Sequence, residues 1–223
     1  YALTFSNGTL TVTTYALTVT ANSQSRAYGA ANPELTGSVV GLQNGDNITA
    51  VYATAAQTNS PVGGYPITVG LLDPDQKLAN YAVTTNNATL TVNPAGLTVT
   101  AEAKTKVYGA DNPTLTGSLV GLQNKDNITA DYSTTAGTGS GVGTYPVLAS
   151  LVDPDHKLGN YSVITNNATL TVTPATLTVT GDPQTRTYGA PNPVLTATLT
   201  GFVNGDTQAA PGVTGAPLLT TTA

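Results

Sequence analysis

The sequence predicts an all-β protein made of small antiparallel β-sandwich domains that follow one another along the chain. Three observations predict it: few charged residues, an alternation of apolar and polar residues with period two, and a long internal repeat. Charged residues are 9% of the 223 residues, against about 25% in an ordinary globular domain. Thr, Asn, Gly and Pro are abundant instead, a composition that favours strands and turns.

The repeat has a period of 80 residues, because Leu17–Ala21 returns at Leu97–Ala101 and again from Leu177. A Tyr-Gly-Ala sequence keeps this period, beginning at Tyr28, Tyr108 and Tyr188. A unit of this length exceeds the roughly 20–45 residues of a solenoid repeat and suits a small domain with a core of its own.

This frame divides the chain into four predicted parts. Residues 1–16 are expected to be the C-terminal strands of a preceding repeat. Residues 17–96 and 97–176 are two whole repeats, and residues 177–223 are the N-terminal part of a third.

Strands are predicted within a repeat where apolar residues alternate with Thr, as in Leu97, Val99 and Ala101, the pattern of a half-buried strand. Thr89–Val92 alternates in the same way, and four further candidates are Leu35–Val40, Ile48–Thr54, Tyr65–Leu72 and Tyr81–Thr85. Six or seven short strands per repeat favour an Ig-like antiparallel sandwich. A β-grasp-like sheet with one short helix near residues 41–50 is the alternative.

The predicted joint between repeats is short. Asn93-Pro94-Ala95-Gly96 separates two expected strands, and proline restricts the backbone there. We therefore expect an elongated rod in which each repeat adds roughly 30–45 Å.

Charge and composition exclude several classes of partner. The net charge is −5 and the seven basic residues are scattered, so the clustered Lys and Arg of a nucleic-acid or anionic-membrane surface are missing. Cysteine is absent, which removes disulfides and thiolate metal sites. No apolar run approaches the ~18 residues of a membrane span, so no membrane insertion is expected in this segment.

No catalytic residues are predicted, and we do not expect an enzyme. The single histidine, His156, has Gln76 at the equivalent position of the first repeat, a replacement that a triad or zinc site would not tolerate. The glycine-rich segment 137–143 lacks the lysine of a phosphate-binding loop and is interpreted as a hairpin loop.

Two pairs of carboxylates are candidate metal ligands: Asp73 with Asp75, and Asp153 with Asp155. Each pair could supply part of the oxygen shell of a Ca²⁺ ion. The alternative is an Asx-type turn with proline fixing the backbone. Lys77 and Lys157 follow these pairs and are also candidates for Lys–Asn isopeptide crosslinks, which need a buried lysine and an assisting acid.

Six asparagines lie in sequons for N-glycosylation: Asn7, Asn47, Asn87, Asn127, Asn160 and Asn167. The recurring tyrosines have two interpretations. They can form a sugar-binding strip, or they can pack over a small core with the hydroxyl at the surface. The second is favoured for Tyr28, Tyr65, Tyr81 and their repeats.

These landmarks resemble the MBG domain, a mostly-β, glycine-rich repeat of the YGX type. The matching stretches are residues 97–100, Tyr108-Gly109-Ala110, Asn112-Pro113, 115–117, 143–146, Asn160-Tyr161 and 168–172, together with 201–206 in the third repeat. The resemblance implies repeats of large bacterial extracellular or cell-surface proteins, often adhesin-like, without catalytic residues.

The expected function is a structural stalk or spacer in a secreted or cell-surface fibrous protein. The alternative is a multivalent module that binds a surface glycan or protein. The expected partners are neighbouring copies or repeats of the same protein, and residues 1–16 can polymerise copies by adding as strands to residues 177–223 of a neighbour. Such polymerisation requires that the sequence is a whole subunit; we favour the alternative, in which the sequence is a window on a longer chain.

Overall fold

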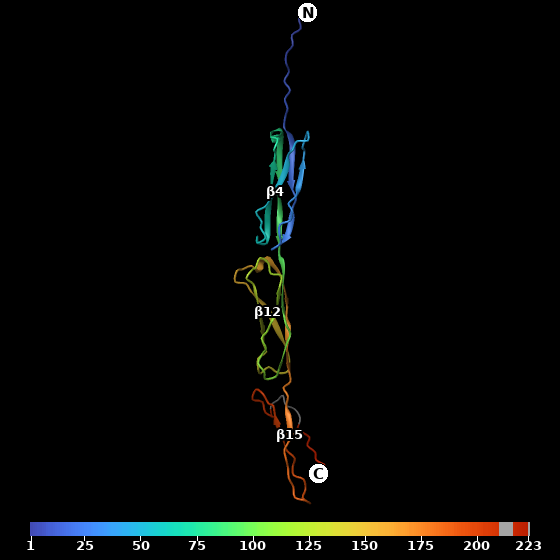
Figure 1. Cartoon of the computed structure of the whole chain (residues 1–223), viewed down its shortest axis with the longest axis vertical. Coiled ribbons are helices and arrows are strands. Elements are labelled where there is room, and N and C mark those ends of the chain that lie inside the picture. The colour runs from blue at the N-terminus through green and yellow to red at the C-terminus, as the bar shows by residue number, and fades with distance from the viewer. Residues whose placement is uncertain (210–215, 223) are drawn as a thin grey trace. The chain divides into compact units, whose positions relative to one another are not determined.

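The computed structural model describes residues 1–209 and 216–222. Residues 210–215 and Ala223 of the predicted third repeat lie outside the described residues. The described part contains sixteen strands and two 3-10 helices of three residues each, and no α-helix (Figure 1). The all-β prediction is confirmed, and the β-grasp alternative is wrong, because residues 41–48 form a loop that leads into a strand.

The strands are as follows, with the 3-10 helices η1 and η2 in their places: β1 (Tyr15–Ala21), β2 (Gln24–Ala27), β3 (Gly37–Val40), β4 (Thr49–Ala53), β5 (Gly63–Leu72), η1 (Leu78–Asn80), β6 (Tyr81–Asn86), β7 (Ala88–Asn93), β8 (Ala95–Ala101), β9 (Lys104–Val107), β10 (Gly117–Val120), β11 (Thr129–Thr134), β12 (Gly143–Val152), η2 (Leu158–Asn160), β13 (Tyr161–Asn166), β14 (Ala168–Thr173), β15 (Thr178–Gly181) and β16 (Ala197–Thr200).

The chain forms two compact units. Unit 1 comprises Tyr1–Leu97, Gly121–Ile128 and Asp153–Val163, and unit 2 comprises Thr98–Val120, Thr129–Val152 and Ile164–Ala223. The second sequence repeat therefore contributes to both units. The repeat boundaries remain a prediction from sequence periodicity, since the compact units do not follow them.

Strands β1 to β7 form two sheets in unit 1, ordered β3-β1-β6 and β2-β7-β5-β4. Most neighbours are antiparallel as predicted, but each sheet also contains one parallel pair. β1 runs parallel to β6 from Tyr15↔Tyr81 onward, and β2 runs parallel to β7 from Gln24↔Leu90 onward. The chain thus returns at the end of the repeat to lie beside the strands with which it began.

The two sheets pack face to face over an apolar core. Leu17 and Val19 of β1 lie in one cluster with Ile48 and Tyr81, and the partly buried side chains of β4 and β5 pack against it. Ile67 of β5 and Leu90 of β7 anchor a second cluster, and neither exposes any side-chain surface. Full burial of such a side chain stabilises the fold by about 1.5–3 kcal/mol. The period-two alternation in the sequence therefore marks the residues that face the core between the two sheets.

The second repeat has the same strand order, β10-β8-β13 and β11-β12-β14-β9. Val147 and Leu170 are completely buried in its core. In the third repeat, the described strands β15 and β16 pair with each other. The repeated sequence thus produces a repeated β-sandwich.

One joint differs from its prediction, and the N-terminal segment contains fewer strand residues than expected. The joint is shorter than expected, because β7 ends at Asn93 and β8 begins at Ala95. Residues 1–14 form no strand, and Leu10 is 92% exposed whereas its repeat equivalent Leu90 is fully buried. The prediction that residues 1–16 belong to a preceding repeat is not tested, although Tyr15 and Ala16 form the start of β1.

Candidate functional site

Unit 1 contains a cluster of two tyrosines around one aspartate, drawn from consecutive sequence repeats. The hydroxyl of Tyr28 donates to the Asp126 carboxylate, at 3.0 Å from Oδ2. The hydroxyl of Tyr161 donates to the same Oδ2 at 2.6 Å. The two rings meet edge to face, with centroids 5.5 Å apart, an arrangement that adds about 0.5–1.5 kcal/mol beyond area burial. One carboxylate thus ties the first repeat to the second.

Tyr28 is held in place by the turn that it begins. Its backbone N–H donates to the Asn93 carbonyl at 2.8 Å, next to the end of β7. Gly29 follows with φ +81°, a left-handed conformation that favours glycine, and its N–H donates to Thr58 O at 3.1 Å. The turn therefore rests on the loop between β4 and β5, with the tyrosine ring projecting from it.

A buried cationic side chain also stabilises this turn. Arg26 on β2 is 7% exposed. Its guanidinium donates to Asn32 Oδ1 at 2.7 Å and to the Gln57 carbonyl. Since a buried charge is costly unless its donors are satisfied, these acceptors fix the geometry of the turn and the loop together. Lys106 takes this place in the second repeat and donates to the carbonyls of Ala110 and Gly137.

Asp126 and Tyr161 are positioned by the second repeat. The backbone turn before Asp126 is closed by its N–H, which donates to Gln123 O at 2.9 Å. Tyr161 follows η2 and is 7% exposed. Its hydroxyl also accepts from the Gln123 N–H at 3.0 Å. The carboxylate and the phenol are therefore set in place independently of Tyr28.

Three further contacts surround the cluster. The Val62 N–H donates to Asn160 Oδ1 at 2.9 Å, and Asn124 Nδ2 donates to the Thr58 carbonyl at 3.5 Å. A Cβ added to Gly29 would lie 2.5 Å from Gln123 Oε1, so the glutamine side chain packs directly over the glycine. The absence of a side chain at Gly29 is what permits this approach.

The same contact occurs in unit 2. The hydroxyl of Tyr108 donates to Asp206 Oδ2 at 2.9 Å, again across 98 residues of sequence. Asn204 Nδ2 donates to the Thr138 carbonyl at 3.3 Å, matching the Asn124–Thr58 contact. The arrangement is therefore a property of the repeat.

Burial and the neighbouring carboxylate raise the pKa values of the two phenols in the cluster. Burial, followed by the hydrogen bond to Asp126, raises the pKa of Tyr161 to about 12. Burial is also the largest cause of a raised pKa for Tyr28. Both groups therefore stay neutral donors at physiological pH. Neutral phenols on a shared carboxylate are suited to holding two surfaces together.

Tyr81 and Tyr161 pack over a core as predicted, but their hydroxyls bond to Asp46 and Asp126, where the prediction had the hydroxyls at the surface. Tyr65 and Tyr145 donate to nearby carbonyls, and Tyr188 is exposed, contrary to the prediction. The prediction missed the aspartates. Asp46, Asp126 and Asp206 recur with the 80-residue period, and that recurrence is the signal that could have found them.

The aspartates predicted as calcium ligands lie in the two short turns before η1 and η2. Asp73 Oδ1 accepts from Lys77 N at 2.9 Å and Oδ2 from Leu78 N at 2.7 Å, and Asp153 makes the same pair of bonds. Burial raises the pKa of Asp153, but the bonds from Leu158 and Lys157 outweigh it and the net pKa is lowered. The carboxylates of Asp73 and Asp153 thus tie each turn to the start of the following 3-10 helix, through N–H groups four and five residues on, whereas an Asx turn bonds two residues on; Asp75 and Asp155 are exposed. Within residues 1–209 and 216–222, no group of three potential metal-ligating side chains occurs, and calcium binding stays a prediction.

The sequon asparagines fall into two groups. Asn7, Asn47, Asn87, Asn127 and Asn167 are exposed, whereas Asn160 is buried. A glycan on Asn160 would have to displace the Val62 contact. Occupancy of the other five stays a prediction.

The remaining candidates show no assembled reactive site. His156 is an exposed turn residue with φ +54°, as is Gln76 in the first repeat with φ +55°. Segment 137–143 leads from β11 into β12 as the predicted loop. Lys77 is exposed, so it lacks the burial that an isopeptide crosslink requires.

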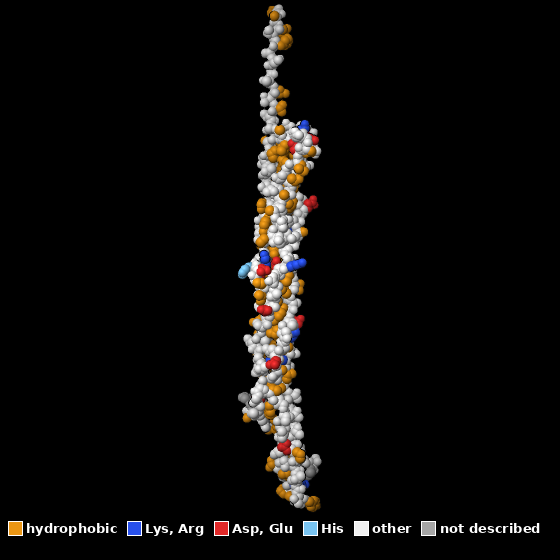
Figure 2. All heavy atoms as spheres, turned by 60° about the vertical axis from the view of Figure 1, so that its left-hand side comes forward, with side chains coloured by type: hydrophobic (Ala, Val, Ile, Leu, Met, Phe, Trp, Pro, Cys, Tyr) orange, Lys and Arg blue, Asp and Glu red, His pale blue; other side chains and the backbone are white. Residues whose placement is uncertain are grey.

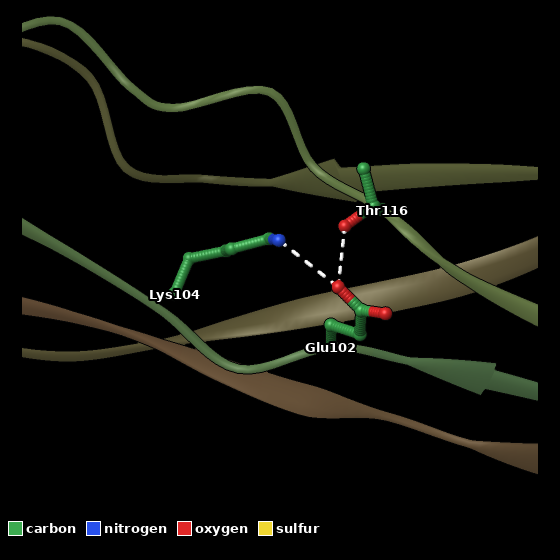
Figure 3. Close-up of polar contacts among 3 residues, drawn as sticks. All are labelled: Glu102, Lys104 and Thr116. Carbon is green, nitrogen blue, oxygen red and sulfur yellow. Dashed lines mark hydrogen bonds and ion pairs between the residues drawn. The ribbon is translucent and has the colours of Figure 1, made fainter.

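Surface charge is sparse and of mixed sign. Figure 2 shows Asp, Glu, Lys and Arg side chains singly or in small mixed groups on the face drawn. Glu102 forms one ion pair: its Oε2 accepts from Thr116 Oγ1 at 2.6 Å and pairs with Lys104 Nζ at 3.0 Å (Figure 3). The Thr116 bond and then Lys104 hold the pKa of Glu102 below its usual range. None of the helices in the described part of the chain is long and apolar enough to cross a membrane.

Comparison with known families decides the identity of the repeat. The model of the MBG domain (YGX type) matches residues 17–91, 97–171 and 177–223. The chain belongs to this family. The three matches make it a tandem array of MBG repeats, as the sequence landmarks predicted, and no curated protein matches the chain in sequence.

Two solved structures align with the MBG repeats only loosely. The crystal structure of Drosophila N-cadherin EC1-4 is 10% identical with a TM-score of 0.27, covering 73% of this chain and 51% of its own. The N-cadherin EC1-3 structure is 10% identical with a TM-score of 0.25, covering 71% and 68%. The chain thus spans about half the length of the first of these structures.

Proposed function

We propose that these MBG repeats are structural spacers of a secreted or cell-surface fibrous protein, in which each repeat is fastened to the next by its Tyr-Gly turn. The observation that carries the proposal is the repeated phenol–carboxylate bond, Tyr28 to Asp126 and Tyr108 to Asp206, each across 98 residues. A domain array with specified contacts at every joint resists bending, which is the mechanical requirement of a stalk. The mixed, sparse surface charge is consistent with a passive role.

The proposed extracellular location follows from the MBG family and the repeat architecture. Neighbouring repeats of the same protein are the proposed partners, and we propose no enzymatic activity. Polymerisation by strand exchange is a further part of the proposal, in which residues 1–16 of one copy add as strands to residues 177–223 of a neighbour. Leu10 and Val12 in this segment are exposed, whereas their repeat equivalents Leu90 and Val92 are buried.

The spacer proposal is tested by removing one joint while keeping the chain complete. Tyr28→Ala should leave the circular dichroism unchanged and increase the spread of distances between two spin labels inside unit 1, one on β4 and one in residues 121–128, measured by double electron–electron resonance. Tyr188→Ala, at the equivalent turn of the third repeat, is the matched control and should leave the distribution narrow. Equal distributions for Tyr28→Ala and the wild type would contradict the proposal.

Binding of a glycan or protein is the alternative function. It is separated from the spacer role by a glycan array probed with the intact chain. Saturable binding to one glycan class that survives Tyr28→Ala would favour a multivalent binding module over a spacer.

A further inference from the structure

The two tyrosines of the Asp126 cluster are a pair of oxidisable side chains in direct contact. Their rings meet with centroids 5.5 Å apart, and no other pair of aromatic rings is in contact among residues 1–209 and 216–222. The sequence contains no cysteine, methionine or tryptophan, so the side chains that usually take up oxidative damage are missing. Tyrosine is therefore the side chain of this sequence that gives up one electron most easily.

One oxygen atom holds both phenols. The hydroxyls of Tyr28 and Tyr161 lie 3.0 and 2.6 Å from Asp126 Oδ2. When two phenols couple after oxidation, the new bond joins ring carbons next to the hydroxyl-bearing carbon, which are the Cε atoms of tyrosine. Because both hydroxyls converge on one atom, the Cε atoms of both rings lie at this end of the cluster. Rotation of a ring about its long axis changes which Cε faces the partner without moving the hydroxyl off the carboxylate.

Asp126 is also placed to accept the protons that oxidation releases. A phenol that loses an electron loses its hydroxyl proton too, and a base within hydrogen-bond reach can take it. Burial raises the pKa of Tyr161 to about 12, so this phenol does not ionise beforehand and its proton leaves with the electron. Asp126 itself is only half-buried, which lets the carboxylate pass each proton on to water.

Burial selects the partner of each radical. Tyr28 is 3% exposed and Tyr161 is 7% exposed. A reactive group enclosed in this way is shielded from side reactions with solvent, and a ring held beside it has a far higher effective concentration than any ring in solution. Since the two tyrosines belong to consecutive sequence repeats, a bond between them would join the repeats covalently.

We propose that Tyr28 and Tyr161 form a dityrosine crosslink when the chain meets hydrogen peroxide and a haem peroxidase, an oxidant that removes one electron at a time. Each phenol loses one electron and its hydroxyl proton, and the peroxide takes up the two electrons and two protons to give two water molecules. A carbon–carbon bond then forms between one Cε of each ring. The hydrogen on each of these carbons moves to the phenolic oxygen as aromaticity returns, so the product is lighter by two hydrogens.

The crosslink would reinforce the joint that the proposed function describes. The proposal rests on the fastening contact of that function and converts it from a hydrogen-bonded joint into a covalent one. A link between residues 28 and 161 closes a long loop, and crosslinks of long loops stabilise the folded state, as disulfides do. The oxidised chain should therefore unfold at a higher urea concentration than the unoxidised chain, and oxidation of Tyr28→Phe should produce no such shift.

The test is oxidation of the full chain by hydrogen peroxide and a haem peroxidase at low micromolar concentration, where collisions between chains are rare. Dityrosine fluorescence and intact mass are measured on the monomer after separation by size, and mass spectrometry identifies the linked peptides. The monomer should lose two hydrogens, and the peptide that contains Tyr28 should be joined to the one that contains Tyr161. Tyr28→Phe and Tyr161→Phe should each abolish this linked peptide, because phenylalanine keeps the ring but forms no phenoxyl radical.

Three further variants separate the role of the cluster from general oxidation. Tyr65→Phe removes a hydroxyl that donates to the Pro61 carbonyl at 2.9 Å, and it should leave the yield unchanged. Asp126→Asn keeps the size of the side chain but removes the base, so the link should form about tenfold more slowly. Asp131→Asn, at an exposed acidic residue of β11, makes the same change of charge and should form the link at the wild-type rate.

The location of the link decides the outcome in the wild type alone. Absence of the Tyr28–Tyr161 peptide from the wild-type monomer, under conditions that couple free N-acetyltyrosine, overturns the proposal. A monomer linked chiefly through other tyrosines also overturns it, as does an Asp126→Asn chain that links as fast as the wild type. These outcomes are distinct from failure of the spacer role, which the spin-label distances measure on the unoxidised chain.

Discussion

Removal of the Asp126 carboxylate should destabilise unit 1, and the equivalent substitution at Asp46 in the first repeat provides the reference for the size of the effect. Asp126 accepts hydrogen bonds from Tyr28 and Tyr161, whereas Asp46 accepts one phenol, that of Tyr81. Asp46→Ala therefore reports the loss of the bond within a repeat. Asp126→Ala reports that loss together with the bond to the preceding repeat.

The difference between the two variants gives the magnitude. A hydrogen bond to a charged group contributes about 1.5–3 kcal/mol, and the freed Tyr28 hydroxyl can regain water at the edge of the cluster. We therefore expect Asp126→Ala to cost about 1.5 kcal/mol more than Asp46→Ala. That corresponds to a roughly tenfold increase in the opening equilibrium.

Native-state hydrogen exchange read by mass spectrometry is the appropriate assay, because it reports local opening without assuming that the whole chain unfolds in one step. Protection of residues 121–128 should fall in Asp126→Ala. In a Tyr28→Phe background, Asp126→Ala should cost no more than Asp46→Ala does in the wild type. If Asp126→Ala and Asp46→Ala lower the stability of the wild type by the same amount, to within about 0.3 kcal/mol, the bond from Tyr28 contributes no free energy and the reasoning fails.

Three further predictions follow from the same geometry. Tyr28→Ala should lower the free energy of unfolding of unit 1 by about 3 kcal/mol, while Tyr188→Ala should change it by less than about 0.5 kcal/mol. If urea unfolding gives the two variants similar losses of stability, burial of Tyr28 does not stabilise the repeat as argued. The pKa of Tyr161 is raised from 10.0 to about 12, so its neutral phenol contributes stability that is fully present below pH 10 and lost as the pH rises through about 12. Unfolding curves measured at successive pH values should show a smaller alkaline loss of stability for Tyr161→Phe than for the wild type. Gly117→Ala should cost about 2–3 kcal/mol, since the added Cβ would lie 2.2 Å from Thr100 O, whereas Gly137→Ala meets nothing within 4 Å and should be nearly neutral in thermal unfolding.

The strands with an apolar face were predictable because burial imposes period two on their residues. Leu17, Val19 and Ala21 of β1 show it directly. β2 was missed for the same reason, since its four residues, Gln24–Ala27, present Arg26 as the one buried side chain. A buried arginine whose donors are satisfied by the Asn32 side chain and by the carbonyls of Ala27 and Gln57 leaves no hydrophobic pattern in the sequence.

The pairing partners were less accessible than the strands. Alternation identifies which residues face a core, but it does not say which strand lies beside which. The parallel neighbours β1 and β6 are separated by most of a repeat, and nothing local to either strand records that contact.

The candidate site was half predictable. The Tyr-Gly turns are visible as repeated landmarks, and their tyrosines were expected to be buried. Their acceptor was missed because Tyr28 reaches into the following repeat, where Asp126 lies 98 residues away. A periodic aspartate is a weak signal until the turn that meets it has been placed.

The parallel pairing of β2 with β7 has a mechanical consequence. β2 is joined through β1 to the N-terminal side of the repeat, and β7 runs to its C-terminal side, in register from Gln24↔Leu90 to Ala27↔Asn93. Tension applied along the polypeptide would drag these two neighbours past each other lengthwise. Their hydrogen bonds would then share the load together and break as a group, whereas a hairpin pulled apart at its open end yields one bond at a time.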